Sequence, residues 1–361
     1  MSLSFDRIVK MLLIFAPIAL IAELTHANPV LVFVLACLGI IPLADLIGEA
    51  TEELAHHTGP KIGGLLNATL GNAAELIITI FALREGLVEL VKASIVGSIL
   101  GNLLLVLGLS LLLGGLKNGI QKFDPRTAGL NATLLILAVV ALAIPSLFDV
   151  AIQQNLAAEL GLSEGVAVIM IILYALSVIY SFTHQGGEHD GAHPTTRDPA
   201  TAHHATKWSV RTSLIVLVVA TLGIVVMSEV LVGAVGHVTE TLGLSELFIG
   251  IIIVPLVGNV AEHLVAVQVA IKNKMELSLA VSLGSSLQVA LFVAPVLVFI
   301  SLLLGGETLL LVFSSFELIA LVSAALVGAF VALDGESNWL EGAMLLGVYA
   351  MVALAFFALP A

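Results

Sequence analysis

The chain has 361 residues, 59% of them hydrophobic and 11% charged, with a mean hydropathy of +1.14 and a formal charge of −13. A soluble domain cannot bury that much apolar surface, so the composition excludes soluble proteins and predicts an all-α integral membrane protein. We therefore expect the lipid bilayer as its surroundings and no nucleic acid as a partner. The lone cysteine, Cys37, excludes a disulfide or a multi-cysteine metal site within one chain.

Eleven apolar stretches are long enough to cross the membrane, which takes about 20 helical residues. Each must be a helix in lipid, because only a helix satisfies its own backbone polar groups locally. We interpret the first stretch as a membrane anchor and not as a cleaved signal peptide, since it lacks a clear small-x-small cleavage site. The stretches are 8–25, 30–55, 61–84, 90–114, 128–147, 164–183, 209–236, 244–271, 277–304, 309–332 and 338–359.

Basic residues are distributed unevenly between the predicted loops. With the N-terminus in the cytoplasm, the inside segments hold eleven of the 13 Lys and Arg residues, whereas Arg84 and Lys92 fall outside. This bias follows the positive-inside rule and predicts a C-terminus on the outside.

Two parts of the chain repeat each other. Residues 53–100 align with 240–287 without a gap at an offset of 187, with 13 identities over 48 positions that include Gly, Asn and Glu. Each copy would hold five helices, and an odd number inverts the second copy, which is an architecture of alternating-access transporters. The predicted division is a first transmembrane helix at 1–28, a first repeat at 29–183, a cytoplasmic His-rich linker at 184–208 and an inverted second repeat at 209–361.

The most specific match between the copies is Gly-Asn-x-Ala-Glu, at 71–75 and at 258–262. Glu75 and Glu262 fall well inside their predicted spans, where a charged group costs about 2.5–3.5 kcal/mol on insertion scales. Asn72 and Asn259 precede them by three positions, so each Asn and Glu share one helix face. A two-fold axis would bring both pairs together at the midplane.

Helix-weakening residues lie directly before these pairs. Gly71 and Gly258, with Pro255 nearby, predict interrupted helices whose free carbonyls point into a cavity. Two carboxylates, two amide oxygens and a few carbonyls form a hard oxygen site, which suits Ca²⁺ and not zinc or copper. The alternative is that Asn and Glu only join helices by hydrogen bonding, and the symmetric repetition of the motif argues against it.

Two facing carboxylates in a low-dielectric site cannot both remain charged when the site is empty. They would therefore bind either a divalent cation or protons. We hypothesise that the site exchanges Ca²⁺ for protons, with no cofactor.

Two longer stretches, NATLGNAAELI at 67–77 and PLVGNVAEH at 255–263, resemble the paired motifs of the cation/proton exchanger (CAX) family, in the cation/calcium exchanger superfamily. GSILGN at 97–102 and GSSLQVALFV at 284–293 resemble the helices that follow those motifs. The resemblance covers the ten helices after the first and implies a Ca²⁺/H⁺ antiporter of eleven helices. It implies that Glu75 and Glu262 carry both Ca²⁺ and protons, with Asn72 and Asn259 as flanking ligands. The residues expected to line the cavity are Gly71, Gly258, Ser98, Ser285, Gln288 and Asn102.

The second motif ends in Glu262-His263, as in proton-coupled members of the family, whereas the first has Leu76 at the equivalent position. His263 could tune Glu262, relay protons or hydrogen-bond a neighbouring helix. The sequence leaves these alternatives open.

A row of acids ends the second predicted helix at its cytoplasmic side. These residues share a face at spacings of three and four and could attract cations to a vestibule, or they could simply form a solvated helix end. Glu53 aligns with Glu240 of the second repeat, and we therefore group Glu240 with these acids. The set is Asp45, Glu49, Glu52, Glu53 and the matching Glu240.

Other polar features have no counterpart in the repeat. Glu23, Glu229 and Glu317 fall within or at the ends of predicted spans, and we expect helix-packing or interfacial roles for them. The central linker carries five histidines, which favours either a flexible connection or a metal- or pH-sensing element.

The sequence thus predicts a secondary transporter and not an enzyme, in the inner membrane of a prokaryote. Sodium coupling, or another divalent cation such as Mn²⁺, is the alternative within this class. A cation channel also presents carboxylates along a path but does not usually need an inverted duplication. An intramembrane hydrolase has little support because the chain lacks His-Glu-x-x-His. A homo-oligomer remains open.

Overall fold

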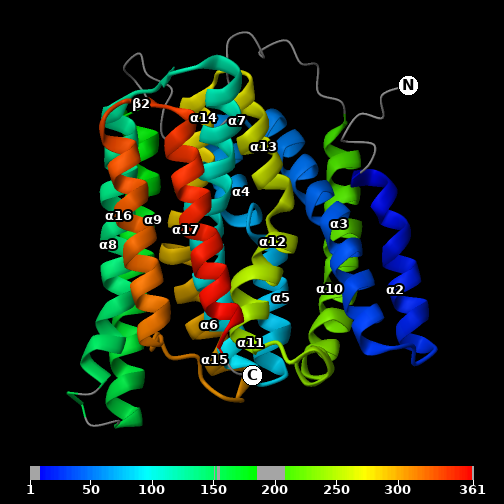
Figure 1. Cartoon of the computed structure of the whole chain (residues 1–361). Coiled ribbons are helices and arrows are strands. Elements are labelled where there is room, and N and C mark those ends of the chain that lie inside the picture. Colours follow the sequence, from blue (N-terminus) through cyan, green and yellow to red (C-terminus); the bar gives the residue numbers. More distant parts are fainter. Residues whose placement is uncertain (1–8, 150, 153–154, 185–207, 360–361) are drawn as a thin grey trace.

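The computed structural model describes residues 9–149, 151–152, 155–184 and 208–359, which form a bundle of helices (Figure 1). The first half of the bundle consists of η1 (Leu12–Ile14), α2 (Phe15–Leu24), α3 (Pro29–Thr58), α4 (Pro60–Leu70), α5 (Ala73–Arg84), α6 (Val88–Leu100), η2 (Gly101–Val106), α7 (Leu107–Asn118), β1 (Gln121–Lys122), α8 (Pro125–Asp149) and α9 (Leu156–His184). The second half consists of α10 (Val210–Leu242), α11 (Glu246–Phe248), η3 (Ile249–Ile253), α12 (Val254–Gly258), α13 (Val260–Ile271), α14 (Met275–Gln288), η4 (Val289–Val293), α15 (Ala294–Leu304), α16 (Ser315–Leu333), β2 (Glu336–Ser337) and α17 (Trp339–Phe357).

Each of the eleven stretches predicted to span the membrane contains helix, but residues 309–314 of the tenth stretch are not helical, and α16 begins only at Ser315. Eight helices there are long and apolar enough to cross a membrane, and a ninth arises if the pair 246–258 and 260–271, bent by 65°, counts as one. The other two stretches correspond to η1 with α2 and to α4 with α5. The predicted all-helical membrane fold is confirmed.

A small sheet at one end of the bundle was not predicted. β1 pairs with β2 in antiparallel orientation, with Gln121 opposite Ser337 and Lys122 opposite Glu336. Strands of two residues are too short to produce an alternating pattern in the sequence. The sheet joins the loop before α8 to the loop before α17.

Local polar groups and glycine set the ends of α3. The side chain of Asn28 accepts a hydrogen bond from the backbone of Val30 at 2.9 Å, and Pro29 occupies the first helical position. Gly59, after the helix, has a φ of +82°, a conformation that residues with a Cβ rarely adopt. The chain can therefore reverse direction sharply between α3 and α4.

The two halves share their helix boundaries. α5 and α13 both have 12 residues and begin 187 positions apart, and α6 and α14, of 13 and 14 residues, also begin 187 positions apart. Figure 1 shows that α4 and α5 run in the opposite direction to α12 and α13. The inverted repeat is therefore present in the fold. The predicted linker at 184–208 falls almost wholly at 185–207, outside the described residues.

The helices that carry the repeated motif lie at the centre of the bundle. α3 packs along α10 and against α2 at one side, and α16 packs against α8 at the other. Between these groups, α6 approaches η3 so closely that a Cβ on Gly97 would collide with the backbone of Ile251. The central helices are thus held in direct contact across the two repeats.

Candidate ion-binding site

Both central spans break at the asparagine of the motif. Asn72 has φ −98° and ψ 21°, and Asn259 has φ −109° and ψ 10°, so each leaves helical geometry in the same way. The following helices, α5 and α13, begin within the core of the bundle. Glu75 and Glu262 lie in their first turns, where the positive end of the helix dipole stabilises a carboxylate.

The glycines of the motif allow the two repeats to cross at this point. A Cβ on Gly71 would lie 3.3 Å from Oε1 of Glu262, and a Cβ on Gly258 would lie 3.1 Å from Cγ of Glu75. Each glycine thus makes room for the glutamate of the other repeat. The structure brings both motifs together around one point.

Hydrogen bonds organise the side chains around the carboxylates. Glu75 accepts bonds at Oε1 from the hydroxyl of Ser98 and from Nδ2 of Asn259. Ser285, at the equivalent position to Ser98, lines the cavity together with Glu262. Each glutamate therefore has a serine from the helix that follows it.

The remaining polar side chains connect the two repeats. Nδ2 of Asn72 donates to Oε1 of Gln288 at 2.7 Å, and Nδ2 of Asn102 donates to Oγ of Ser285 at 3.0 Å. All predicted cavity-lining residues lie around the two carboxylates, but Ser98 and Asn102 are buried behind the cavity wall.

Three buried oxygen atoms at this point have no hydrogen-bond partner among the described residues. They are Oδ1 of Asn72, Oε2 of Glu75 and Oε2 of Glu262. Buried acceptors without a partner carry a cost of about 1–3 kcal/mol each. A cation with a preference for hard oxygen ligands would satisfy all three, and the described residues offer no cluster of three His, Cys, Asp or Glu as an alternative.

A cavity of about 280 Å³ leads to the site from one end of the bundle. It begins beside Glu52 and His56 near the end of α3 and reaches Glu262, Gln288 and Ser285. Glu75 does not line it. The sequence analysis missed five polar residues of its wall, which are His56, Asn67, Asn131, Tyr174 and Ser177.

The predicted vestibule acids do not form one group. Asp45, Glu49 and Glu52 line the cavity, and Glu49 also accepts a bond from Lys10 at 3.0 Å. Glu53 instead faces the backbone of Trp208, just before α10.

The grouping of Glu240 with these acids is wrong. It lies near the far end of α10, while Glu53 lies beside the start of that helix. An inverted repeat places equivalent residues at opposite ends of the bundle, so the match between the two acids argues against a shared vestibule.

His263 follows Glu262 but does not line the cavity. Its side chain is buried, and its Nε2 has no hydrogen-bond partner among the described residues. Leu76, at the equivalent position, is partly buried against the core. The three roles considered for His263 remain predictions.

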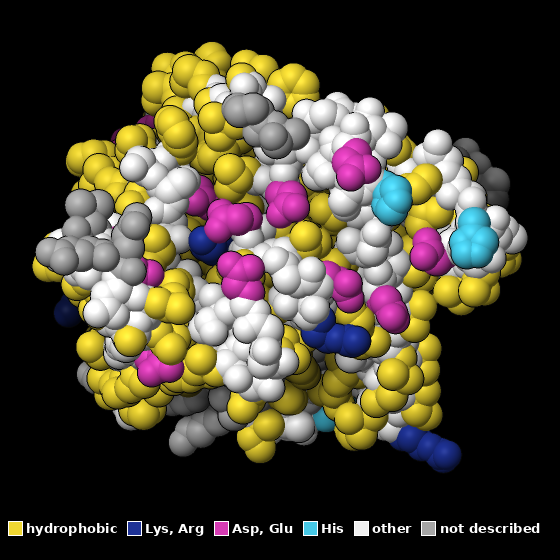
Figure 2. Space-filling view, turned by 90° about the horizontal axis from the view of Figure 1, so that it is seen from below, with side chains coloured by type: hydrophobic (Ala, Val, Ile, Leu, Met, Phe, Trp, Pro, Cys, Tyr) yellow, Lys and Arg dark blue, Asp and Glu magenta, His cyan; other side chains and the backbone are white. Residues whose placement is uncertain are grey.

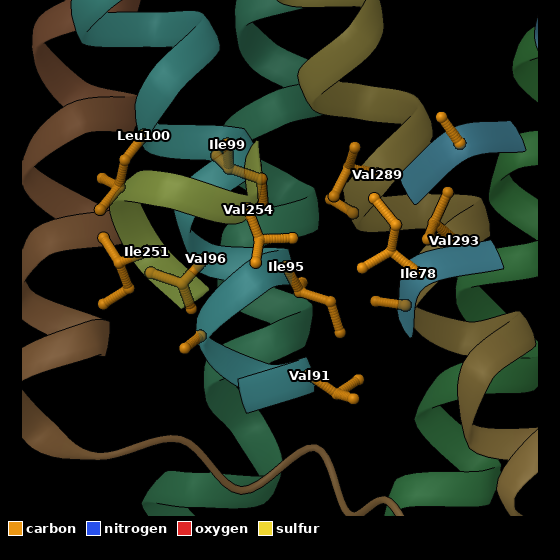
Figure 3. Close-up of a cluster of buried hydrophobic side chains, with 14 of the residues drawn as sticks. Ile78, Val91, Ile95, Val96, Ile99, Leu100, Ile251, Val254, Val289 and Val293 are labelled. Carbon is orange, nitrogen blue, oxygen red and sulfur yellow. The ribbon is translucent and has the colours of Figure 1, made fainter. Parts of the chain in front are cut away.

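Apolar side chains close the site toward the other end of the bundle (Figure 3). Ile78 lies one turn beyond Glu75 on α5, and Ile95 lies one turn before Ser98 on α6. Val254 lies one turn before Gly258 on α12, and all three are almost fully buried. This apolar plug lies on the side of the site away from the cavity.

The fold and the site together define a secondary active transporter. Inverted repeats, helices broken at mid-depth and an ion site at the repeat interface are the features of that class. A cavity on one side and a plug on the other correspond to one of its alternating states.

The sequence matches the sodium/calcium exchanger protein family over residues 28–183 and 212–358, and the chain belongs to this family. The predicted resemblance to cation/proton exchangers is also confirmed. A Ca²⁺/H⁺ antiporter of Synechocystis sp. is 44% identical over 370 residues, covering 98% of each chain. The Ca²⁺/H⁺ antiporter ChaA of Bacillus subtilis is 45% identical over 344 residues, covering 95% of this chain and 96% of that one.

Solved structures agree with this assignment. Native YfkE superimposes with a TM-score of 0.84 at 43% identity, over 97% of this chain and 100% of that one. The H⁺/Ca²⁺ exchanger CAX superimposes with a TM-score of 0.73 at 16% identity, over 98% and 92%, which shows the shared fold alone. The chain is thus a transporter and not an enzyme.

Proposed function

We propose that this protein exchanges Ca²⁺ for protons across a membrane, at a site formed by Glu75, Glu262, Asn72 and Asn259. One observation carries the proposal. Where the repeats cross, the two carboxylates and the Asn72 amide leave three buried oxygens without a hydrogen-bond partner. The bacterial Ca²⁺/H⁺ antiporters that match nearly the whole chain support the same substrates.

The exchange follows from the electrostatics of the site. Two ionised carboxylates without a counter-ion are unstable where the effective dielectric constant is low. Bound Ca²⁺ neutralises both, and protons do so in its absence. The site can therefore cross between the two access states when it carries Ca²⁺ or protons, but not when it is empty and doubly charged. This requirement couples the two fluxes.

We assign the cavity to the cytoplasmic side of a cell membrane. Described basic residues near the cavity end include Lys117, Lys122, Lys272 and Lys274, whereas the opposite end carries Arg84 and Lys92. Figure 2 views that opposite end, where acidic side chains outnumber basic ones. The positive-inside rule then orients the bundle. Ca²⁺ enters the cavity from the cytoplasm and leaves through the plugged side.

The test is ⁴⁵Ca²⁺ uptake into proteoliposomes with an imposed pH gradient, with a pH-sensitive dye inside. We expect calcium-driven proton movement in the parent protein. Glu75→Gln and Glu262→Gln should each lower uptake about 100-fold or more, because an amide can neither neutralise Ca²⁺ nor carry a proton.

Glu229→Gln is the matched control, since Glu229 is an exposed acid on α10 outside the site and its loss should leave uptake unchanged. Full activity in either site variant would overturn the proposed site. Uptake driven by a sodium gradient but not by a pH gradient would overturn the proton coupling, and a preference for Mn²⁺ would overturn the calcium assignment.

A further inference from the structure

The chain between α15 and α16 crosses the plugged end of the bundle. Residues 305–314, which we call the strap, are all described and form neither helix nor strand. Leu309, Leu311 and Phe313 are 0–4% exposed, so every second side chain of this stretch inserts between the helices. The strap therefore belongs to the packed structure of this end.

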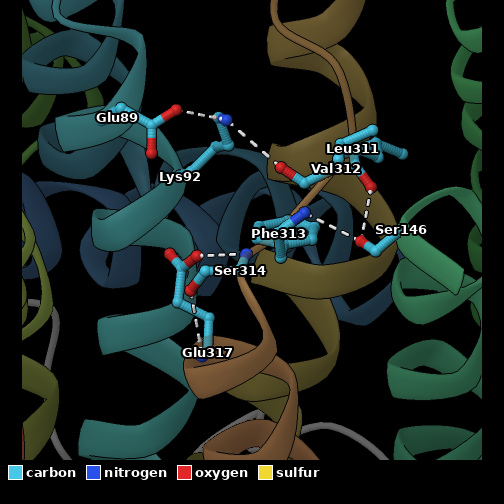
Figure 4. A network of polar contacts seen from close by, with 8 residues as sticks. All are labelled: Glu89, Lys92, Ser146, Leu311, Val312, Phe313, Ser314 and Glu317. Atoms are coloured by element: carbon cyan, nitrogen blue, oxygen red, sulfur yellow. Dashed lines mark hydrogen bonds and ion pairs between the residues drawn. The ribbon is translucent and has the colours of Figure 1, made fainter. Parts of the chain in front are cut away.

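Serine side chains from three helices hold the backbone of the strap. Oγ of Ser301 on α15 accepts a bond from Leu309 N at 2.9 Å, and Oγ of Ser163 on α9 accepts one from Leu311 N at 3.1 Å. Oγ of Ser146 on α8 accepts a bond from Phe313 N at 2.8 Å (Figure 4). The strap is thus fixed to α8, α9 and α15.

Lys92 connects the strap to α6. Its Nζ donates to the backbone oxygen of Val312 at 3.2 Å and pairs with Glu89 on its own helix (Figure 4). The lysine side chain is only 14% exposed. A hydrogen bond to a charged group that is largely shielded from water is stronger than one at the surface.

A buried acid reinforces this connection. Glu317 is 0% exposed at the start of α16, where its Oε2 accepts a bond from Ser314 N at 2.8 Å. Its other oxygen, Oε1, has no hydrogen-bond partner among the described residues. Its charge interacts with those of Glu89 and Lys92. The ammonium of Lys92 thus balances two acids and holds one backbone carbonyl.

The position of Lys92 links this cluster to the ion site. α6 also carries Ser98, which bonds to Glu75, and Ile95, which belongs to the apolar plug. Opening a route to Glu75 from this end requires α6 to move away from the helices around it. Such a movement must break the contact between Lys92 and Val312.

The equivalent segment at the cavity end is held differently. Gln121, between α7 and α8, donates from Nε2 to Ala270 O at 2.8 Å and to Oδ1 of Asn273 at 3.0 Å. That connection uses a neutral amide, whereas the one at the plugged end uses a charged ammonium. The contact made by a charged group, Lys92, therefore lies at the plugged end of the bundle.

We propose that Lys92 is a positioning residue that latches α6 to the strap and keeps the route from this end closed while the opposite cavity is open. The inference rests on the proposed exchange only because each transport cycle would have to release the latch. Loss of a hydrogen bond to a charged group shifts an equilibrium by about tenfold or more. Removing the ammonium should therefore shift the protein toward the state that is open at the strap end.

The test measures access to each side of the site with a charged, water-soluble thiol reagent on the purified full chain. Cys37→Ala removes the lone cysteine of the sequence. Val254→Cys then reports on the plug, where Val254 is 1% exposed, and Ala280→Cys reports on the cavity, which Ala280 lines. We expect Lys92→Met to raise the labelling rate of Val254→Cys about tenfold and to lower that of Ala280→Cys.

Two control variants separate a latch from general loosening. Lys92→Arg keeps the charge and should restore the parent rates, and Lys122→Met removes an exposed lysine from β1 at the other end and should change neither. A Val254→Cys rate within twofold of the parent, or faster labelling at both reporters, would overturn the latch. Labelling requires no Ca²⁺ or proton flux, so a failure here is distinct from a failure of the proposed exchange.

Discussion

Glu75 and Glu262 occupy the same position in two copies of one motif, yet the structure surrounds them differently. Glu75 is 2% exposed, accepts bonds from Ser98 and Asn259, and does not line the cavity. Glu262 is partly exposed and lines the cavity. The duplication supplies two chemically equivalent carboxylates, whereas the conformational state of the bundle decides which of them an ion from solution meets.

This difference assigns separate tasks to the two carboxylates in the present state. In the proposed site, Glu262 would receive an ion from the cavity, and Glu75 would complete its set of ligands. Because the repeats are inverted, a route from the strap end would reach Glu75 first. Paired substitutions at equivalent positions of the two repeats test this difference.

The largest difference is expected for the two glycines. A Cβ on Gly71 would lie 2.7 Å from the backbone oxygen of Asn67, so the backbone itself must shift at the helix break. A Cβ on Gly258 would come closest to the side chain of Glu75, at 3.1 Å from its Cγ, and would meet no backbone atom closer than 4.0 Å. Overpacking costs about 1–3 kcal/mol, so we expect Gly71→Ala to lower ⁴⁵Ca²⁺ uptake about 100-fold and Gly258→Ala about tenfold.

Gly161→Ala is the matched control, because nothing lies within 4 Å of a Cβ at that helical position. It should retain full uptake. A more severe loss in Gly258→Ala than in Gly71→Ala would contradict the asymmetry described here.

A smaller difference is expected for the two serines. Ser98 donates to Glu75 in a buried setting, and loss of a bond to a charged group costs about 1.5–3 kcal/mol. Ser285 lines the cavity, where water can replace its hydroxyl. We expect Ser98→Ala to raise the half-saturating Ca²⁺ concentration about 10- to 100-fold and Ser285→Ala about threefold. Equal effects in the two variants would show that the burial of Glu75 does not matter.

The smallest effect is expected at the mouth of the cavity. Asp45→Asn and Glu49→Gln remove negative charge from the cavity wall, and each should lower uptake at low ionic strength about twofold. The effect should vanish in high salt, since screening shortens electrostatic attraction. Glu240→Gln, at the other end of the bundle, should have no effect when Ca²⁺ is supplied on the cavity side.

The helices and the repeated motif could be predicted from the composition of the sequence and from its internal repetition. Hydropathy located every helical stretch, and the repeated Gly, Asn and Glu located the motif, because such residues are costly in lipid unless they have a function. It could not predict the wall residues Asn131 and Tyr174, since lone polar residues in a span carry no mark of which face they occupy. The sequence also could not predict that Glu75 and Glu262 differ in exposure, because the motif has the same Gly, Asn, Ala and Glu in both copies.

Two π-helical segments, η2 and η4, lie beside the site, one in each repeat. η2 and η4 lie in equivalent spans, directly after the helices that carry Ser98 and Ser285. Segments of this kind are rare and occur mostly at functional sites. Because both halves have one at the equivalent position, the widened turn belongs to the repeated unit. It places the same local widening of the helix after Ser98 and after Ser285.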